Sequence, residues 1–358
     1  MKVLDLFCGT GGFSRGAHAA GLDVAAAVDV DETLTSSFSS NFPNVPIWLR
    51  NVADLTGPEI RSLLGHAVDG VIGGPPCQGF SSIGRRSPDD PRRALFGHFC
   101  RLVGELEPAF FVVENVVGLG QKGGRDVLEA ALNTIPRAYD VSLPLVLDAS
   151  LFGAPTRRKR LFVAGVHRDR GRLPDLAAIP RRPGPTVRDA IFDICNAEFL
   201  GVGPDGFDVW RGSEKPKSEY ALRMVTDDLT FTGNMPTAHG PAVVDRFSVV
   251  PQGGKDVVGR HPRLAWDGYC PTLRAGTGSD RGSYQSVRPI HPTEARVITV
   301  REAARLQGFP DAHRFHPTVW HSFRMIGNSV PPPMAEAILS AVSQACGASG
   351  PVLRHAAE

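Results

Sequence analysis

The sequence has few cysteines, and their spacing indicates neither disulfides nor a zinc ribbon. The six cysteines, at positions 8, 77, 100, 195, 270 and 346, are scattered over 358 residues without a C-x-x-C pair. Disulfide-dependent domains are dense in cysteine and secreted, so this chain is expected to fold in a reducing environment. The histidines at 313, 316 and 321 have no cysteines or carboxylates at ligand spacing, and we expect no metal site.

Long apolar runs are missing too. A membrane-spanning helix needs about 18 or more consecutive apolar residues, and no stretch approaches that length. Asp5 interrupts the N-terminal "MKVLDLFCG", which is unlike the apolar region of a signal peptide. The sequence therefore predicts a cytoplasmic protein that has no membrane partner.

The excess of positive over negative charge is small for the whole chain but concentrated in one segment. The formal net charge is only +2, so no polycationic tail binds nucleic acid in bulk. Residues 157–172, however, hold seven arginines and lysines against the single acid Asp169. This stretch is either an ordinary solvated strip or a binding site for phosphates.

The first 170 residues do contain a regular alternation of apolar strand-like runs and helical stretches. Helices are expected at 13–20, where Gly21 suits a C-cap, and at 96–106. Strands are expected at 2–7, 23–30, 70–74, 108–116, 140–148 and 160–166. This rhythm predicts an α/β fold with a Rossmann-like, doubly wound sheet and helices on both faces.

The composition changes near residue 172, where proline, glycine and arginine crowd together. No clear period follows until about residue 295, and helical periodicity then returns at 299–309 and 334–345. We expect a large domain over 1–180 and a second, smaller, loop-rich domain over 181–288. Residues 289–358 are expected to be a return segment that completes the large domain.

A glycine-rich loop, "DLFCGTGGF", directly follows the first expected strand and opens the first helix. Small residues there let backbone amides approach a ligand at the ends of the strands. Asp29 ends the second strand, where a carboxylate can bind the hydroxyls of a ribose. The spacing is not the dinucleotide fingerprint G-x-G-x-x-G. These residues leave two interpretations open. One is a site for a nucleoside-containing cofactor, NAD included, and the other is a tight turn with an incidental acid.

A rigidly held thiol and a strand-end carboxylate indicate covalent chemistry. In "GGPPCQGFSS", residues 73–82, two prolines fix the backbone just before Cys77, and nearby arginines would favour its thiolate. Glu114 interrupts the apolar strand "VVENV", which is costly unless the carboxylate is used. Together with a nucleoside cofactor they imply attack on a ring whose nitrogen is protonated. An inert packed cysteine and a structural carboxylate are the alternatives.

These motifs resemble those of a known family. "DLFCGTGGFS", "GPPCQGFS", "ENV", "RRKR" and "GNSVPPP" occur in the same order as the motifs of bacterial-type C5-cytosine-specific DNA methyltransferases. The matches span 3–165 and 289–340. The resemblance implies S-adenosylmethionine as cofactor, with S-adenosylhomocysteine as product and no metal. It also implies methyl transfer to C5 of a flipped-out cytosine in a specific double-stranded DNA sequence.

The resemblance assigns roles to four catalytic residues. Cys77 would add to C6 of the cytosine, and Glu114 would hydrogen-bond and protonate N3. Arg158 and Arg160 would hold the base carbonyl, nearby phosphates and the catalytic carboxylate. Residues 1–180 would be the catalytic and cofactor-binding domain, and residues 181–288 the target-recognition domain.

The resemblance also supplies a set of cofactor contacts, namely Phe7, Gly9, Gly11, Asp29, Val30, Asn51, Val52, Pro76, Leu95, Asn328 and Ser329. Two positions depart from the family pattern. Asn51 stands where an acid commonly meets the adenine amine, and Thr156 replaces the glutamine often found before the paired arginines. These departures bear on cofactor affinity and local packing rather than on the reaction.

Double-stranded DNA is the implied partner. Residues 78–98 resemble the loop that closes over DNA, and Thr272 with Leu273 matches a Thr-Leu element near the flipped nucleotide. The expected DNA contacts are Ser81, Arg85, Arg86, Thr272, Arg274 and Arg281, with ordinary surface loops as the alternative reading. We expect a monomer on DNA within a restriction–modification system, accompanied by a cognate endonuclease or acting as an orphan.

Three other functions fit the sequence less well. A nicotinamide or flavin enzyme with a redox cysteine does not account for Glu114, the arginine pair and "GNSV" together. A protein that binds DNA without modifying it would not need both Cys77 and Glu114. The alternative of a tRNA cytosine-C5 methyltransferase from the same family lacks support, because its Cys-Phe-Thr element is absent and the loop reads "CQGFSS".

Overall fold

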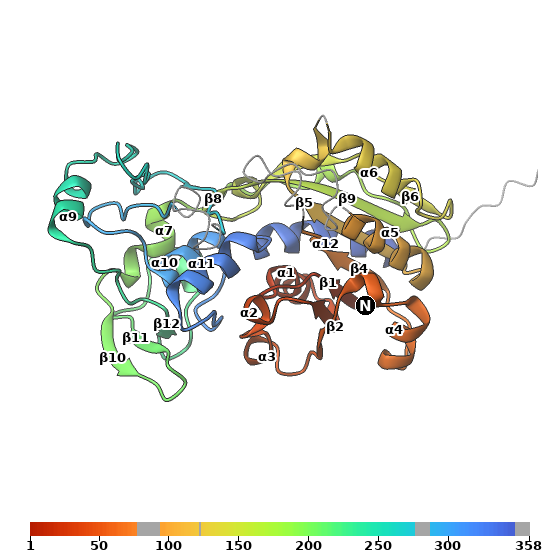
Figure 1. Ribbon diagram of the computed structural model, residues 1–358, viewed down its shortest axis with the longest axis horizontal. Coiled ribbons are helices and arrows are strands. Elements are labelled where there is room, and N and C mark those ends of the chain that lie inside the picture. The colour runs from red at the N-terminus through yellow and green to blue at the C-terminus, as the bar shows by residue number, and fades with distance from the viewer. Residues whose placement is uncertain (77–93, 122, 276–286, 348–358) are drawn as a thin grey trace, which may run out of the picture.

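The computed structural model describes residues 1–76, 94–121, 123–275 and 287–347. They form two lobes of different construction (Figure 1). The larger lobe is built on an eight-stranded sheet covered by helices, and the smaller lobe joins a three-stranded sheet to short helices and long loops. Within these ranges, no helix has both the length and the apolar character that crossing a membrane requires.

The central sheet confirms the doubly wound α/β fold predicted from the sequence. Its strand order is β3-β2-β1-β4-β5-β9-β6, and β7 also pairs with β9. The first five strands are parallel, whereas β9 runs antiparallel to β5, β6 and β7. The strands are β1 (Lys2–Leu6), β2 (Asp23–Asp29), β3 (Ile47–Leu49), β4 (Gly70–Gly73), β5 (Phe110–Asn115), β6 (Tyr139–Val141), β7 (Leu145–Asp148) and β9 (Lys159–His167).

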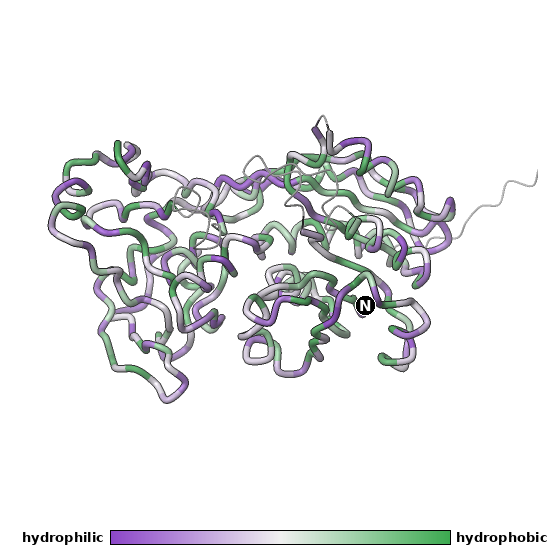
Figure 2. Tube along the Cα trace, viewed as in Figure 1, coloured by the Kyte–Doolittle hydropathy of each residue, from purple (hydrophilic) through white to green (hydrophobic). Residues whose placement is uncertain are grey.

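Helices bury both faces of this sheet. Because successive side chains of a strand point to opposite faces, Val3 belongs to one apolar cluster and Leu4 to the other. One face is covered by α1 (Gly12–Ala19) and α12 (Pro332–Gly347), with α3 (Phe38–Asn41) at its edge, whereas Leu34 of α2 (Glu32–Thr35) packs against the apolar core of the smaller lobe. The other is covered by α4 (Gly57–Leu64), α5 (Leu95–Leu106) and α6 (Arg125–Leu132). Burial on both sides explains why apolar residues run along the strands (Figure 2).

Two strands differ from the sequence prediction. The strand expected over 140–148 is two strands, β6 and β7, which pair with different parts of β9. Pro144 lies between them, and its missing N–H interrupts the ladder. The short strand β3 was not predicted, because its three residues are too few to show a period.

The smaller lobe has its own apolar core. It comprises α7 (Val187–Ile191), α8 (Glu219–Leu222), α9 (Pro241–Ser248), α10 (Val300–Gln307), α11 (Val319–Asn328), β10 (Glu198–Val202), β11 (Asp208–Arg211) and β12 (Thr230–Thr232). β13 (Cys270–Pro271) joins it to β8 (Thr156–Arg157). One apolar cluster contains Ile191 of α7, Leu306 of α10 and Phe323 of α11. Helices α10 and α11 therefore belong to the core of the smaller lobe, whereas α12 packs on α1 of the larger lobe. The domain limits at 180 and 288 stay a prediction.

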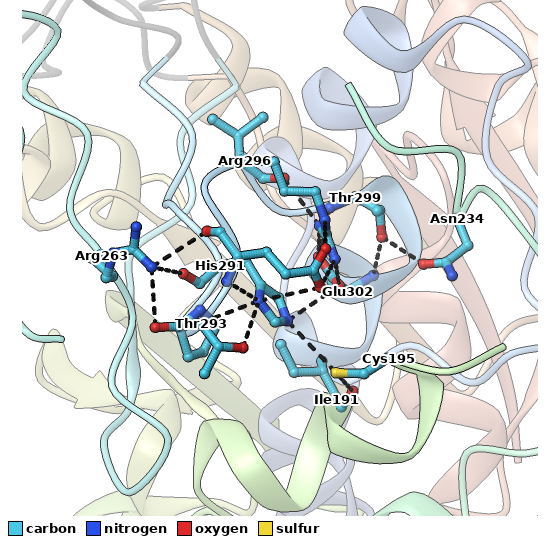
Figure 3. Close-up of polar contacts among 12 residues, drawn as sticks. Ile191, Cys195, Asn234, Arg263, His291, Thr293, Arg296, Thr299 and Glu302 are labelled. Atoms are coloured by element: carbon cyan, nitrogen blue, oxygen red, sulfur yellow. Dashed lines mark hydrogen bonds and ion pairs between the residues drawn. The ribbon is translucent and has the colours of Figure 1, made fainter. Parts of the chain in front are cut away.

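A buried polar network fixes the loops of the smaller lobe (Figure 3). Arg296 pairs with Glu302 of α10 at 2.8 Å, and the Nε2 atom of His291 lies 3.7 Å from the same carboxylate. Arg263 donates to the carbonyl oxygen of His291 at 3.0 Å. Loops that bury little apolar surface need hydrogen-bonded polar side chains of this kind to adopt a single conformation.

Candidate active site

The predicted site residues meet where the winding of the sheet reverses. β1 lies between β2 and β4, and the chain winds outward in both directions from it. In open parallel sheets, ligands bind outside the carboxyl ends of the strands at such a point. The glycine loop follows β1, Asp29 ends β2, and Pro75 follows β4. Glu114 is the second-last residue of β5, the strand next to β4.

The glycine loop has a backbone that requires glycine. Gly9 and Gly11 have φ values of 50° and 87°, and Phe7 before them has a φ of 61°. This region costs glycine little and other residues more. A Cβ atom on Gly11 would lie 2.3 Å from a ring carbon of Phe42, whereas one on Gly9 would meet none of the described residues within 4 Å. Among those residues, the loop is therefore packed at Gly11 and open at Gly9.

Asp29 holds this loop and presents an apolar neighbour. Its Oδ2 atom accepts from the Gly9 N–H at 2.8 Å, and its Oδ1 atom accepts from the Val30 and Asp31 N–H groups at 2.7 and 2.9 Å. Burial raises the pKa of Asp29 against the effect of these donors. Val30 is 68% exposed beside this half-buried carboxylate. An apolar surface next to fixed polar groups suits a planar base attached to a sugar.

The remaining predicted cofactor residues occupy different environments. Asn51 is exposed, and its Oδ1 atom accepts from the Ala53 N–H at 3.1 Å, which caps the short 3₁₀ turn Val52–Asp54. Val52 itself is buried against the α5 face of the sheet. Leu95 begins α5, and both Leu95 and Pro76 are half-buried.

Glu114 and Arg160 form a largely buried ion pair. The Arg160 Nε atom lies 2.8 Å from the Glu114 Oε1 atom, with exposed side-chain fractions of 14% and 11%. A Cβ atom on Gly74 would lie 3.2 Å from Glu114 Oε2, so the β4 loop passes directly over the carboxylate. Burial raises the pKa of Glu114, although Arg160 and Arg158 oppose the rise. This carboxyl group is therefore easier to protonate than an exposed one.

Asn115 ties the end of β5 to the loop that leads to Cys77. Its Nδ2 atom donates to the Pro75 carbonyl oxygen at 3.1 Å, and its Oδ1 atom accepts from the Val116 N–H. The chain two residues before Cys77 is thus fixed beside Glu114. Several predicted residues lie outside the described ranges: Cys77, Ser81, Arg85, Arg86 and Arg281.

Arg158 joins three segments in the interior. Its Nη1 and Nη2 atoms donate to the carbonyl oxygens of Leu273 and Gly327 at 3.0 and 2.7 Å. Burial lowers the pKa of this guanidinium well below its usual value. Thr272, next to Leu273, is exposed and donates to the Arg157 carbonyl oxygen at 2.7 Å. Arg158 therefore holds the Thr-Leu element and the end of α11, while Arg160 is the arginine that pairs with Glu114.

The "GNSV" segment lies against the start of α1. A Cβ atom on Gly12 would lie 2.5 Å from the Val330 carbonyl oxygen and 3.1 Å from the Ser329 Cβ atom. Ser329 is buried, whereas Asn328 is exposed at the end of α11. Arg274 is exposed at the end of the Thr-Leu element. In the part of the chain that the structure describes, no group of three or more metal-ligating side chains occurs.

Comparison with known proteins identifies the class of this fold and site. The family model of C-5 cytosine-specific DNA methylases matches residues 1–344, and the chain belongs to this family. It is a DNA cytosine-5-methyltransferase of the bacterial type II kind. Among curated relatives it is similar to the type II methyltransferase M.XorII of Xanthomonas oryzae pv. oryzae. The two are 42% identical over 94% of this chain and 82% of the relative.

Solved structures agree with this assignment. A DNA modification methyltransferase encoded within an Escherichia coli prophage has a TM-score of 0.84 and 37% identity, over 97% of this chain and 99% of that one. The Dnmt2 methyltransferase of Schizosaccharomyces pombe has a TM-score of 0.62 and 17% identity, over 96% and 98% of the two chains. At that identity the likeness shows a common fold alone.

Proposed function

We propose that the enzyme transfers a methyl group from S-adenosylmethionine to C5 of a flipped-out cytosine in a specific double-stranded DNA sequence. The observation that carries this proposal is the Glu114–Arg160 pair at the end of β5, beside the loop that leads to Cys77. A buried carboxyl group of raised pKa at that position suits hydrogen bonding and proton donation to a ring nitrogen.

The glycine loop after β1 and the end of β2 form the proposed cofactor site. Among the described residues, the space at Gly9 lets a ligand approach the small-residue loop closely. The fixed Asp29 carboxylate suits a ribose, and the exposed Val30 suits an adenine. Phe7, Gly9, Gly11, Asp29, Val30, Asn51, Val52, Pro76, Leu95, Asn328 and Ser329 are the proposed contacts. When bound, S-adenosylmethionine supplies an electrophilic methyl group.

The chain's own residues prepare the cytosine for that methyl group. The Cys77 thiolate adds to C6, which places electron density on C5, while Glu114 donates a hydrogen bond and a proton at N3. Arg160 holds the Glu114 carboxyl group in place, and Arg158 holds the Thr-Leu element next to it. After C5 is methylated, a base removes the C5 proton, the thiolate leaves C6, and N3 returns its proton to the Glu114 carboxylate, which restores the neutral aromatic ring.

The smaller lobe is the proposed reader of the DNA target. Residues 181–288 place Thr272 and Arg274 close to the Arg158 side of the site, and Arg281 belongs to the same segment. Ser81, Arg85 and Arg86 are proposed to contact DNA from the loop after Cys77. Extruding a base costs a few kcal/mol, which contacts of this kind must offset. We further propose a cytoplasmic monomer on DNA, with or without a cognate endonuclease.

A trapping experiment tests the proposed reaction. Duplexes that carry 5-fluorocytosine at the target should form an adduct resistant to denaturation, because fluorine cannot leave as a proton. Cys77→Ala should form no adduct and transfer no methyl group, whereas Cys195→Ala, in the smaller lobe, should behave as wild type. An adduct with Cys77→Ala, or none with wild type on methylatable DNA, would overturn the proposal. Efficient methylation of a tRNA in preference to DNA would instead favour the RNA-directed alternative.

A further inference from the structure

His313 reaches from the smaller lobe to the glycine loop, 303 residues away in sequence. The imidazole is fully buried, with its Nε2 atom 3.2 Å from the Thr10 Oγ1 atom. Its Nδ1 atom lies 3.2 Å from the Arg15 Nη2 atom at the start of α1. The rings of Phe309 and Phe315 lie 4.6 and 4.9 Å from it, so the imidazole is enclosed by aromatic side chains.

Both ring nitrogens of His313 face polar groups. The Nδ1 atom faces the Arg15 guanidinium, which has only donors, and the Nε2 atom lies 3.2 Å from both the Thr10 Oγ1 atom and the Asn41 Nδ2 atom. The imidazole therefore links the glycine loop to α1 and to Asn41 of α3. Burial, with the charges of Arg15 and Arg301, lowers the pKa of His313 well below its usual value, in agreement with a neutral ring.

The core of the smaller lobe fixes the His313 backbone. Arg301 of α10 donates from Nη2 to the His313 carbonyl oxygen at 2.9 Å and from Nε to the Thr232 carbonyl oxygen at 2.9 Å. Asn41 brackets the next residue, because it donates to the Arg314 carbonyl oxygen and accepts from the Arg314 N–H, each at 2.8 Å. The imidazole is thus a rigid support.

Thr10 stands between the two glycines of the loop. Asp29 holds the loop at the Gly9 N–H, and His313 holds it at the Thr10 hydroxyl from the other side. A glycine-rich segment loses much conformational entropy when it is ordered, so a loop ordered before the ligand arrives binds more tightly. We propose that His313 is a positioning residue that presets the glycine loop for the cofactor, an inference that rests on the cofactor site proposed above.

The test separates binding of the cofactor from the chemical step. His313→Phe keeps the aromatic packing and removes the polar contacts of the ring to Thr10, Arg15 and Asn41. We expect its Kd for S-adenosylhomocysteine, measured by calorimetry, and its KM for S-adenosylmethionine to rise about two- to tenfold, the effect of one net hydrogen bond. We expect kcat at saturating cofactor and the Kd for DNA to stay within about twofold, since the lost interaction is uniform binding.

Two further variants control this experiment. His18→Phe changes another histidine that packs on the Phe42 ring from α1, at 5.4 Å, and should leave both affinities unchanged. His313→Gln keeps a donor within reach of Thr10 and should recover part of the lost affinity. Thr10→Val removes the hydroxyl from the other side, so adding it to His313→Phe should cost little more than either change alone.

The outcomes are distinct. Wild-type affinity in His313→Phe, or full additivity with Thr10→Val, would overturn the role of His313. If His313→Phe does not fold, His313→Gln and Thr10→Val decide the question by the same measurements. If the wild-type protein itself binds no S-adenosylhomocysteine, the proposed cofactor site fails, and that result is recognisable because it appears before any variant is compared.

Discussion

Burial and the neighbouring arginines act in opposite directions on the pKa of the Glu114 carboxyl group. Glu114→Gln keeps the shape and the hydrogen bond to a ring nitrogen but cannot supply a proton. We expect turnover to fall about 10²–10⁴-fold, the usual contribution of general acid–base catalysis. The Kd for S-adenosylhomocysteine should stay nearly unchanged, because Glu114 lies near the end of β5 rather than of β1 or β2. Single-turnover methylation and calorimetry measure the two quantities, and a loss below about tenfold would mean that Glu114 is structural.

The pH dependence of the same residue has a defined sign. Burial raises the pKa of Glu114, and in the proposed reaction the protonated form donates to N3. The kcat/KM of the wild-type enzyme should therefore decline as pH rises through this raised pKa. The residual kcat/KM of Glu114→Gln should not decline over the same pH range, since an amide does not titrate. If kcat/KM of the variant declines with pH as that of the wild type does, another group is responsible for the decline.

Asn51 has one acceptor oxygen, and the protein already uses it. The Oδ1 atom caps the turn at Ala53, and the second polar atom of the side chain is a donor. An aspartate could cap the turn with one oxygen and accept from the adenine amine with the other. Asn51→Asp should therefore tighten S-adenosylhomocysteine binding by about 0.5–1.5 kcal/mol, with turnover at saturating cofactor unchanged. Calorimetric titration of both forms checks this, and unchanged or weaker binding would show that residue 51 does not meet the adenine.

At the level of single residues, sequence patterns reveal groups that break a local rule. Glu114 is visible because a carboxylate interrupts an apolar strand, and Gly9 because it follows a strand and opens a helix. Thr10 and His313 break no rule. Their contact exists only because two lobes meet, and no spacing or periodicity encodes a pair 303 residues apart. Histidine 313 is conspicuous in the sequence only as one of three nearby histidines.

At the scale of elements, α1 and α12 pack closely where they cross. A Cβ atom on Gly16 would lie 2.4 Å from the Ala335 Cβ atom and 2.9 Å from the Pro332 carbonyl oxygen. Gly16→Ala should therefore destabilise the protein by about 1–3 kcal/mol through overpacking, in spite of the better helix propensity of alanine. Denaturant unfolding measures the change.

Gly97 of α5 provides the matched control. A Cβ atom there would meet no atom of the described residues within 4 Å, so Gly97→Ala should be neutral or stabilising by up to about 1 kcal/mol. Equal effects of the two substitutions would mean that α1 and α12 are not in close contact in solution.

The elements that sequence predicts well are those whose period is long enough to read. β1, β2, α1 and α5 lie within about one residue of their expected bounds, because apolar alternation and helical periodicity mark them. The smaller lobe is different. Its sheet, β10 to β12, is built from three- to five-residue strands, and β10 carries the exposed side chains Phe199, Leu200 and Val202. Buried polar pairs such as Arg296–Glu302 fix its loops, and such pairs have no sequence period.

At the scale of the whole molecule, the low net charge predicts that DNA binding depends on local basic groups. The logarithm of the DNA affinity should fall linearly with the logarithm of salt concentration, by about 0.9 per neutralised phosphate. Arg274→Ala should lower that slope by about one if the side chain meets a phosphate, and should relax specificity at unchanged slope if it meets a base edge. Arg168 lies by β6, at the sheet edge far from the smaller lobe (Figure 1). Arg168→Ala should change neither quantity, and an equal effect there would point to non-specific attraction.

The packing of α12 on α1 also sets an order of events on the ribosome. Val3, Phe13 and Ala17 share an apolar cluster with Met334 and Ile338, which are synthesised last among these residues. At about 5–20 residues per second, the nascent first strand and helix wait tens of seconds for their partner. During that time they expose an apolar face that chaperones can bind. A chain whose translation stops within the smaller lobe leaves this face uncovered and lacks Ser329 beside Gly12, so we expect such a chain not to methylate DNA.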